Sequence, residues 1–152
     1  MEGYFFDSSA LAKLYHPEVG TPEVDRIVQA SGSRIWISRL SVVELPSVFA
    51  IKVRTQFISR EDAGIFLRQF REDIVARKLE VFAVHEAVFS EAERLLEQHA
   101  FERRLRALDA IQVAVALGLK REGLADYFVA ADKVLCEVAA LEGFAVLNPE
   151  HP

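Results

Sequence analysis

The sequence predicts an α/β fold in which a parallel β-sheet carries helices on both faces. Short apolar runs that favour β-structure alternate with longer segments of helical periodicity along the whole chain. Several of these runs are apolar throughout, as is typical of strands buried on both faces. No stretch rich in Pro, Gly or Ser and no repeat of 20 to 50 residues divides the sequence. We therefore predict a single domain spanning residues 1–152.

Capping and helix-breaking residues delimit the elements of the N-terminal half. The predicted order is a strand at 4–6, a helix at 10–15, a helix at 21–30, a strand at 35–37 and a helix after Ser38. The pair His16-Pro17 ends the first helix. Thr21 is the expected N-cap of the second helix, with Pro22 at its first position. Pro46 is expected to kink the third helix or to reset its start.

The C-terminal half continues the same alternation. A helix from Ser59 to about Arg77 is predicted from apolar residues that recur at helical spacing: Ala63, Phe66, Leu67, Phe70 and Ile74. The predicted elements that follow are a strand at 79–84, a helix at 88–99, a helix at 107–120, a strand at 127–130, a helix at 132–141 and a strand at 144–147. The helix at 107–120 is apolar on several faces, so we expect it to be central and buried.

Composition and charge exclude several classes of protein. The net charge of −5 argues against a protein that coats polyanions with its whole surface. Cys136 is the only cysteine, so it forms no internal disulfide, and no Cys/His cluster has zinc-ligand spacing. No secretory leader and no 18-residue apolar span is present. We therefore expect a cytoplasmic protein that is not inserted in a membrane.

Four carboxylates are placed where an α/β sheet binds its ligands. Asp7, Glu44 and Asp132 follow the first, second and fourth predicted strands, and Asp109 starts the apolar helix. Because ligands bind beyond the carboxyl ends of parallel strands, we expect the four side chains to meet at one edge of the sheet. Carboxylates crowded together favour protonation until a divalent cation supplies positive charge. The pattern therefore predicts a metal site.

Helix capping is the alternative explanation for the same residues. Asp7 and Asp132 are suitable N-caps, and Glu44 stands three residues after Ser41, which is the spacing of a capping box. Asp7, however, ends a fully apolar strand, and Asp109 lies in an apolar helix. A solvated cap does not need that setting, so the functional interpretation is preferred.

Four segments resemble the signature blocks of PIN-domain ribonucleases. They are Phe5–Leu11 (FFDSSAL), Ser38–Glu44 (SRLSVVE), Leu108–Ala114 (LDAIQVA) and Phe128–Lys133 (FVAADK), followed by a closing FAVLNP at 144–149. Their order and their spread over residues 5–148 also match, which implies the FEN/PIN nuclease fold. The single short domain most resembles the VapC-type toxins of toxin–antitoxin pairs. One departure is Ala130, where many relatives carry Thr or Ser two residues before the last aspartate.

The resemblance implies a Mg²⁺- or Mn²⁺-dependent endoribonuclease with an antitoxin partner and a homodimeric assembly. Asp7 and Asp109 are the expected metal ligands, while Glu44 and Asp132 complete a second position or orient the attacking water. Oxygen-only ligands of this kind select hard ions such as Mg²⁺. Ser9 is expected to cap the first helix or to hydrogen-bond a ligand or water.

An arginine cluster precedes the central helix, and it suits contacts with the phosphates of RNA. It consists of Arg103, Arg104 and Arg106. The alternative is a solvated loop whose charges pair with Glu97 and Glu102.

Apolar residues between Pro46 and Phe70 exceed what one helix face usually buries, and they are candidates for an antitoxin groove or a homodimer face. Those considered are Phe49, Phe57, Phe66 and Phe70.

Three other functions compete with the nuclease. A PIN-like fold without activity would be a binding module for RNA or protein, and Ala130 gives this alternative some weight. A receiver-type phosphoacceptor domain would use an Asp at a strand end and a later Lys, as Asp7 and Lys133 are placed, but residues 35–50 lack the acidic pair it needs. A haloacid dehalogenase-type hydrolase would need a second Asp where Ser9 stands.

Overall fold

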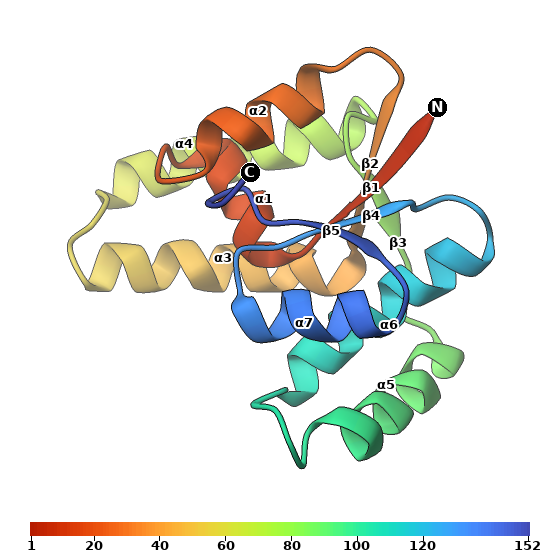
Figure 1. The fold of residues 1–152 in the computed structure, drawn as a ribbon. Helices are drawn as coiled ribbons and strands as arrows, with labels where there is room; N and C mark the ends of the chain where they lie inside the picture. The colour runs from red at the N-terminus through yellow and green to blue at the C-terminus, as the bar shows by residue number, and fades with distance from the viewer.

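The computed structural model describes residues 1–152, and it contains a five-stranded parallel sheet with helices on both faces (Figure 1). The strands are β1 (Glu2–Phe6), β2 (Ser33–Ser38), β3 (Glu80–Phe82), β4 (Tyr127–Val129) and β5 (Ala145–Leu147). The helices are α1 (Ser8–Tyr15), α2 (Thr21–Gln29), α3 (Arg39–Arg54), α4 (Arg60–Val75), α5 (Glu86–His99), α6 (Ala107–Arg121) and α7 (Lys133–Leu141). The predicted α/β class and the predicted alternation of elements are therefore confirmed. None of the helices combines the length and the apolar character needed to cross a membrane.

The sheet has the strand order β3-β2-β1-β4-β5, with every neighbouring pair parallel. The first strand is central, and Phe5 pairs with Trp36 on one side and with Phe128 on the other. The order reverses between β1 and β4, which makes this junction the switch point where such sheets bind ligands. The flavodoxin-like order 2-1-3-4-5 differs from this one, so the topology excludes the receiver alternative.

Alternate strand residues enter two separate cores. Phe5, Trp36 and Phe128 pack with buried residues of α5, α6 and α7. Their chain neighbours Phe6, Ile37 and Val129 pack with α1 to α4 on the opposite face. This is the alternation that a pleated strand imposes, and it shows that both faces of the sheet are covered.

Helix α6 is central and largely buried, as predicted. Eight of its residues are buried, including Val113, Val115 and Leu119. It packs against α5 and α7 and ends before Gly123, whose φ of +73° suits glycine at a helix C-terminus. A stable central helix holds its first turn, with Asp109, at a defined place beside the sheet.

The expected N-cap of the second helix is wrong, whereas the expected start of the third helix after Ser38 is confirmed. Gly20, with φ of +94°, occupies the N-cap of α2, while Thr21 lies inside the helix and its hydroxyl donates to the carbonyl of Lys13. Helix α3 begins after the N-cap Ser38, as predicted, and it continues through Pro46, so the proline does not reset the start of the helix. Buried residues on either side of the proline, Leu45 and Phe49, pack into the core. This packing offsets the hydrogen bond that a proline removes.

The expectation that four phenylalanines form a partner surface is wrong for two of them. Phe49 and Phe70 are fully buried, since Phe49 packs against Phe66 and Phe70 against Tyr15. Only Phe57, in the turn between α3 and α4, is largely exposed, at 77%. The periodicity identified both helices, but the two helices cover each other's apolar faces.

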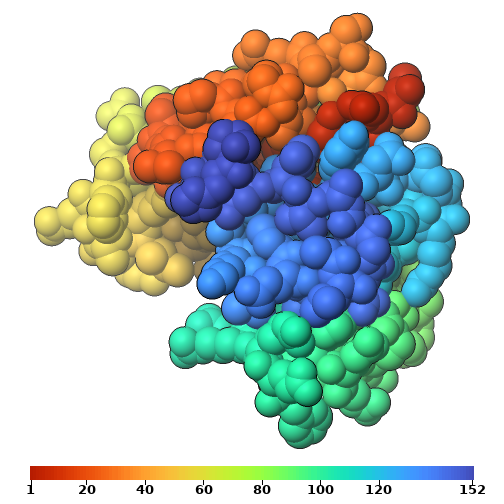
Figure 2. Space-filling view, in the orientation of Figure 1, coloured from red at the N-terminus to blue at the C-terminus, as the bar shows by residue number.

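The α3–α4 pair projects from the rest of the molecule as a lobe (Figures 1 and 2). Between the two helices lies a mainly apolar groove of about 390 Å³. Its lining consists of Pro46, Phe49, Ala50, Val53, Arg54, Arg60, Ala63, Gly64 and Leu67.

Candidate functional site

A cleft of about 170 Å³ lies at the carboxyl ends of β1 and β4 and contains all four predicted carboxylates. Its lining residues are Asp7, Ser8, Ser9, Glu44, Asp109, Gln112, Asp132 and Leu135. The four carboxylates come from the N-cap of α1, from α3, from α6 and from the N-cap of α7, and so from positions up to 125 residues apart. The expectation that these acids meet at one edge of the sheet is therefore confirmed.

Asp7 is the most buried of the four carboxylates, at 4% exposed. It caps α1, because its Oδ1 accepts a hydrogen bond of 2.8 Å from the backbone N–H of Ala10. Burial raises the pKa of Asp7 to about 7, against the hydrogen bonds from Ala10 and Ser9, and the charges of Asp132 and Glu44 add to the rise. The capping role and the place in the cleft are thus both real.

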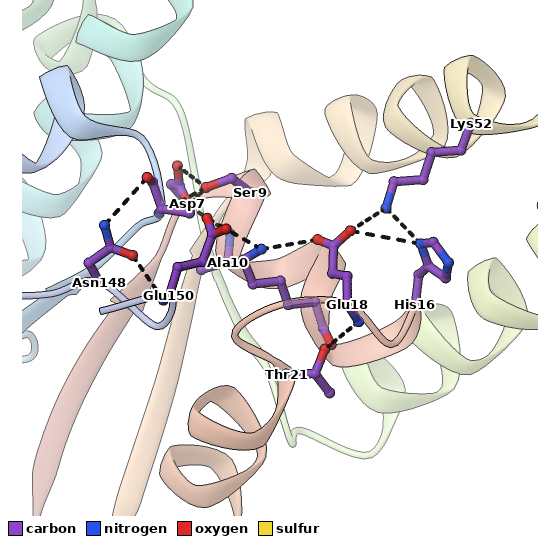
Figure 3. Close-up of polar contacts among 11 residues, drawn as sticks. Asp7, Ser9, Ala10, His16, Glu18, Thr21, Lys52, Asn148 and Glu150 are labelled. Atoms are coloured by element: carbon purple, nitrogen blue, oxygen red, sulfur yellow. Dashed lines mark hydrogen bonds and ion pairs between the residues drawn. The ribbon is translucent and has the colours of Figure 1, made fainter. Parts of the chain in front are cut away.

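Ser9 joins Asp7 to the turn after β4. Its hydroxyl lies 2.7 and 2.8 Å from the two carboxylate oxygens of Asp7, and it accepts a hydrogen bond of 3.2 Å from the backbone N–H of Ala131 (Figure 3). The adjacent Ala130 is buried and contributes no hydroxyl. Ser9 does not cap the helix itself, since Asp7 takes that position.

Asp109 and Asp132 also have local partners. The backbone N–H of Arg106 donates to Asp109 Oδ2 at 3.2 Å, at the start of α6. Burial raises the pKa of Asp109, this hydrogen bond opposes the rise, and the charge of Asp132 adds to it. Asp132 is exposed and caps α7 by accepting from the N–H of Leu135 at 2.9 Å. Each helix start therefore presents a carboxylate to the same cleft.

Glu44 is not part of a capping box. Ser38 caps α3, while Ser41 is buried inside the helix. Glu44 Oε1 instead accepts from the Ser8 hydroxyl at 2.9 Å and from Gln112 Nε2 at 2.7 Å. The spacing Ser-x-x-Glu matches a local motif, but partners on two other helices determine the contact.

Three further residues of this network, Ser8, Ser41 and Gln112, were not predicted from the sequence as part of the site. One signal was present. Gln112 is the only polar side chain between Asp109 and Lys120 on an otherwise apolar helix. A lone amide in a buried helix needs a hydrogen-bond partner, so it points to a polar neighbour.

The cleft has an excess of negative charge. None of the ion pairs in the structure includes Asp7, Glu44, Asp109 or Asp132. No three acidic, His or Cys side chains stand close enough to hold a metal ion as they are placed. The donors nevertheless fit Mg²⁺, because this ion prefers oxygen, binds one or two carboxylates directly and keeps several waters.

The arginine cluster before α6 is only partly free. Arg103 lies 3.6 Å from Glu102 and 3.9 Å from Glu137, so the expected pairing with Glu102 is confirmed. No ion pair involves Glu97. Arg104 and Arg106 are exposed and form no ion pair, and the backbone N–H of Arg106 contacts the cleft residue Asp109.

Cys136 lies beside the cleft on α7. It is half-buried, and its Sγ donates to the carbonyl of Ala130. Burial and the charges of Asp7 and Asp132 raise the pKa of the thiol to about 11. The thiol therefore stays protonated at neutral pH and is a poor nucleophile.

A second polar network fastens the C-terminal residues to α1 (Figure 3). Asn148 Nδ2 donates to the carbonyl of Ala131 at 3.5 Å. The carboxylate of Glu150 lies 3.7 Å from Lys13, which is only 5% exposed and also lies 3.2 Å from Glu18. Glu18 in turn pairs with Lys52 of α3 at 2.9 Å. Because Asn148 bonds to Ala131, this network supports the turn between β4 and α7, which Ser9 also contacts.

Comparison with known proteins identifies relatives of this fold. A family model of the PIN domain matches residues 4–141. No curated protein sequence matches the chain. The structure of VapC20 from Mycobacterium tuberculosis, a toxin that cleaves the sarcin–ricin loop, is similar with a TM-score of 0.67 and 18% identity, covering 93% of this chain and 96% of that one.

Two further structures show the same likeness. FitAcB from Neisseria gonorrhoeae has a TM-score of 0.64 and 16% identity, covering 98% of this chain and 99% of that one. PAE2754 from Pyrobaculum aerophilum has a TM-score of 0.63 and 20% identity, covering 99% and 91%.

Proposed function

This chain belongs to the PIN-domain family, and we propose that it is a Mg²⁺- or Mn²⁺-dependent endoribonuclease acting as the toxin of a toxin–antitoxin pair. The observation that carries the proposal is the convergence of Asp7, Glu44, Asp109 and Asp132 on one cleft, where none of them forms an ion pair. The similarity to VapC20, a toxin that cleaves the sarcin–ricin loop, supports RNA as the substrate.

We assign the metal to Asp7 and Asp109, with Glu44 and Asp132 completing a second position or orienting water. A bound divalent ion would lower the pKa of an attacking water and stabilise negative charge on the phosphate oxygens. Because the pKa of Asp7 is about 7, metal binding at neutral pH competes with a proton at this carboxylate. The local contacts of Ser9 and Ala10 hold Asp7 in place during that exchange.

Arg104 and Arg106 are the proposed contacts for the RNA backbone. Both side chains are exposed, and neither is neutralised by an acidic partner. A guanidinium can bind a phosphate through two parallel hydrogen bonds. The hydroxyl of Ser9 is hydrogen-bonded to Asp7 and to the backbone of Ala131. We propose that it also contacts a water molecule in the cleft.

We propose a protein antitoxin as partner and a homodimer as the assembly. A chain of the toxin–antitoxin complex from Klebsiella pneumoniae and a chain of VapBC2 from Rickettsia felis have the same fold as this chain, with TM-scores of 0.61 and 0.64. The apolar groove between α3 and α4 is the proposed antitoxin contact. Co-expressed antitoxin should co-purify with the wild type and not with Ala50→Arg, while light scattering measures the assembly.

A catalytically inactive binding module is the second candidate. The observation that favours it is Ala130, which leaves the turn before Asp132 without a side-chain hydroxyl. Such a module would keep the cleft and the antitoxin groove but would show no metal-dependent turnover.

One experiment separates the two candidates. Purified wild type, Asp7→Asn and the matched control Asp25→Asn, which lies on α2 outside the cleft, are each incubated with total cellular RNA in Mg²⁺, Mn²⁺ or chelator. We expect metal-dependent cleavage by the wild type and by the control, and none by Asp7→Asn. Equal cleavage by all three proteins, or cleavage in chelator, would contradict the proposed site. Absence of cleavage by all three would favour the binding module.

A further inference from the structure

We propose that Gln112 is a positioning residue that holds the carboxylate of Glu44 in the cleft, together with Ser8 and Ser41. The inference rests on the proposed function, because it assigns Glu44 a working position in the metal site. It concerns a different residue, however, and it is carried by hydrogen bonds rather than by the likeness to other proteins.

Gln112 joins three helices at the floor of the cleft. Its Nε2 lies 2.7 Å from Glu44 Oε1, 3.1 Å from the Ser41 hydroxyl and 3.2 Å from the Ser8 hydroxyl. Gln112 belongs to α6, Ser8 to α1, and Ser41 and Glu44 to α3. The amide is only 3% exposed. On the buried side of Glu44, the amide of Gln112 therefore takes the place of a water molecule as hydrogen-bond partner.

Two donors of this network are directed toward one carboxylate oxygen, Oε1 of Glu44. A carboxylate only accepts, so Gln112 presents its N–H₂ group to Glu44, and Ser8 donates its hydroxyl to the same oxygen at 2.9 Å. Because the hydroxyl hydrogen of Ser8 is used in this way, Ser41 donates to Ser8 across 2.9 Å. Glu44 Oε1 thus receives two hydrogen bonds, while its Oε2 receives none and stays available to a ligand in the cleft.

The other end of the amide shows that Gln112 is not a simple packing residue. Its Oε1 is buried and has no hydrogen-bond partner. An unpaired buried carbonyl is unfavourable, and an apolar side chain such as Met would avoid it. The opposite orientation of the amide would pair this oxygen with the serines, but it would place it against Glu44 Oε1. The contact with Glu44 therefore determines the orientation of the Gln112 amide, and the amide carbonyl is left without a hydrogen bond.

The test compares Gln112→Met, Glu44→Gln and the double variant with the wild type. Gln69→Met is the matched control, because Gln69 also donates its amide to a carboxylate, that of Asp73 at 3.0 Å, outside the cleft. The dissociation constant for Mn²⁺ is measured by calorimetry, cleavage of total RNA is measured in parallel, and urea unfolding reports whether each variant is folded.

We expect Gln112→Met to weaken Mn²⁺ binding by about tenfold or more, the effect typical of residues that orient metal ligands. We expect no further weakening when it is added to Glu44→Gln, and no effect of Gln69→Met. Unchanged Mn²⁺ binding in a folded Gln112→Met protein, or equal weakening in both backgrounds, would overturn the inference.

The outcomes also separate this inference from the proposed function. If the wild type binds Mn²⁺ and loses affinity in Gln112→Met but cleaves no RNA, the nuclease proposal fails and the positioning role stands. If the wild type cleaves RNA and Gln112→Met binds Mn²⁺ normally, only the positioning role fails. If the wild type binds no Mn²⁺, both fail.

Discussion

Replacing Asp7 by Asn should make the metal-free protein less sensitive to pH. The pKa of Asp7 is about 7 in the folded protein against an ordinary value of 3.8, so the folded state holds this proton more tightly than the unfolded state. The resulting stabilisation is complete below pH 4 and is lost as the pH rises through 7. With 1.36 kcal/mol for each unit of pKa, the full loss is about 4 kcal/mol, of which about 2.5 kcal/mol falls between pH 5 and pH 8.

Urea unfolding of both proteins at pH 5 and pH 8, with chelator present, measures this difference. Asn can still accept the hydrogen bond from Ala10 and is a favoured N-cap, so the variant should fold. Other titrating groups are common to both proteins, and they cancel when the variant is compared with the wild type. We expect the advantage of the variant to grow by about 2.5 kcal/mol between the two pH values. An advantage that is the same at both would show that Asp7 is ionised in the folded protein at pH 5.

Three further predictions use the same unfolding assay. Mg²⁺ at 100 times its dissociation constant should raise the unfolding free energy of the wild type by about 2.7 kcal/mol and leave Asp7→Asn unchanged; equal shifts would indicate binding elsewhere. Gly3→Ala should cost about 1–3 kcal/mol or more, since its Cβ would lie 1.8 Å from a backbone oxygen, whereas Gly64→Ala, with open space around it, should be neutral or stabilising. Phe49→Ala should lower the unfolding free energy by about 3–5 kcal/mol, because Phe49 is fully buried, and Phe57→Ala by less than about 0.5 kcal/mol, because Phe57 is exposed. Similar losses in the two variants would contradict this difference in burial.

Local patterns were enough to predict the features that depend on neighbouring residues in the chain. The apolar run that stops at Asp7 identified both the first strand and the acid at its end, and the same reasoning placed Asp132 after the fourth strand. Helix and strand types followed from periodicity, because a buried face repeats every 3.6 or every 2 residues. The convergence of the acids followed from the rule that the carboxyl ends of parallel strands share one edge.

Features that depend on contacts between distant elements could not be predicted in this way. The spacing of Ser41 and Glu44 is consistent with a capping box, and only the packing of α6 against α3 shows that Gln112 is the partner. The periodicity around Phe49 and Phe70 indicates helices but does not tell which neighbour covers each face. Gly20, and not Thr21, is the N-cap of α2, because the chain enters that helix through a residue with positive φ. No short sequence motif predicts this conformation.

The central position of β1 has a consequence for the timing of protein synthesis. Gly3 and Asp126 are bonded to each other twice, through both backbone N–H groups, although 122 residues separate them in the chain. A nascent chain of one hundred residues contains Asp7 and Glu44 but neither Asp109 nor Asp132. The cleft is therefore incomplete until most of the chain has left the ribosome, since the late strand must pair with the earliest one. On the proposed function, the four carboxylates that would cut RNA are assembled only when translation of the chain is nearly finished.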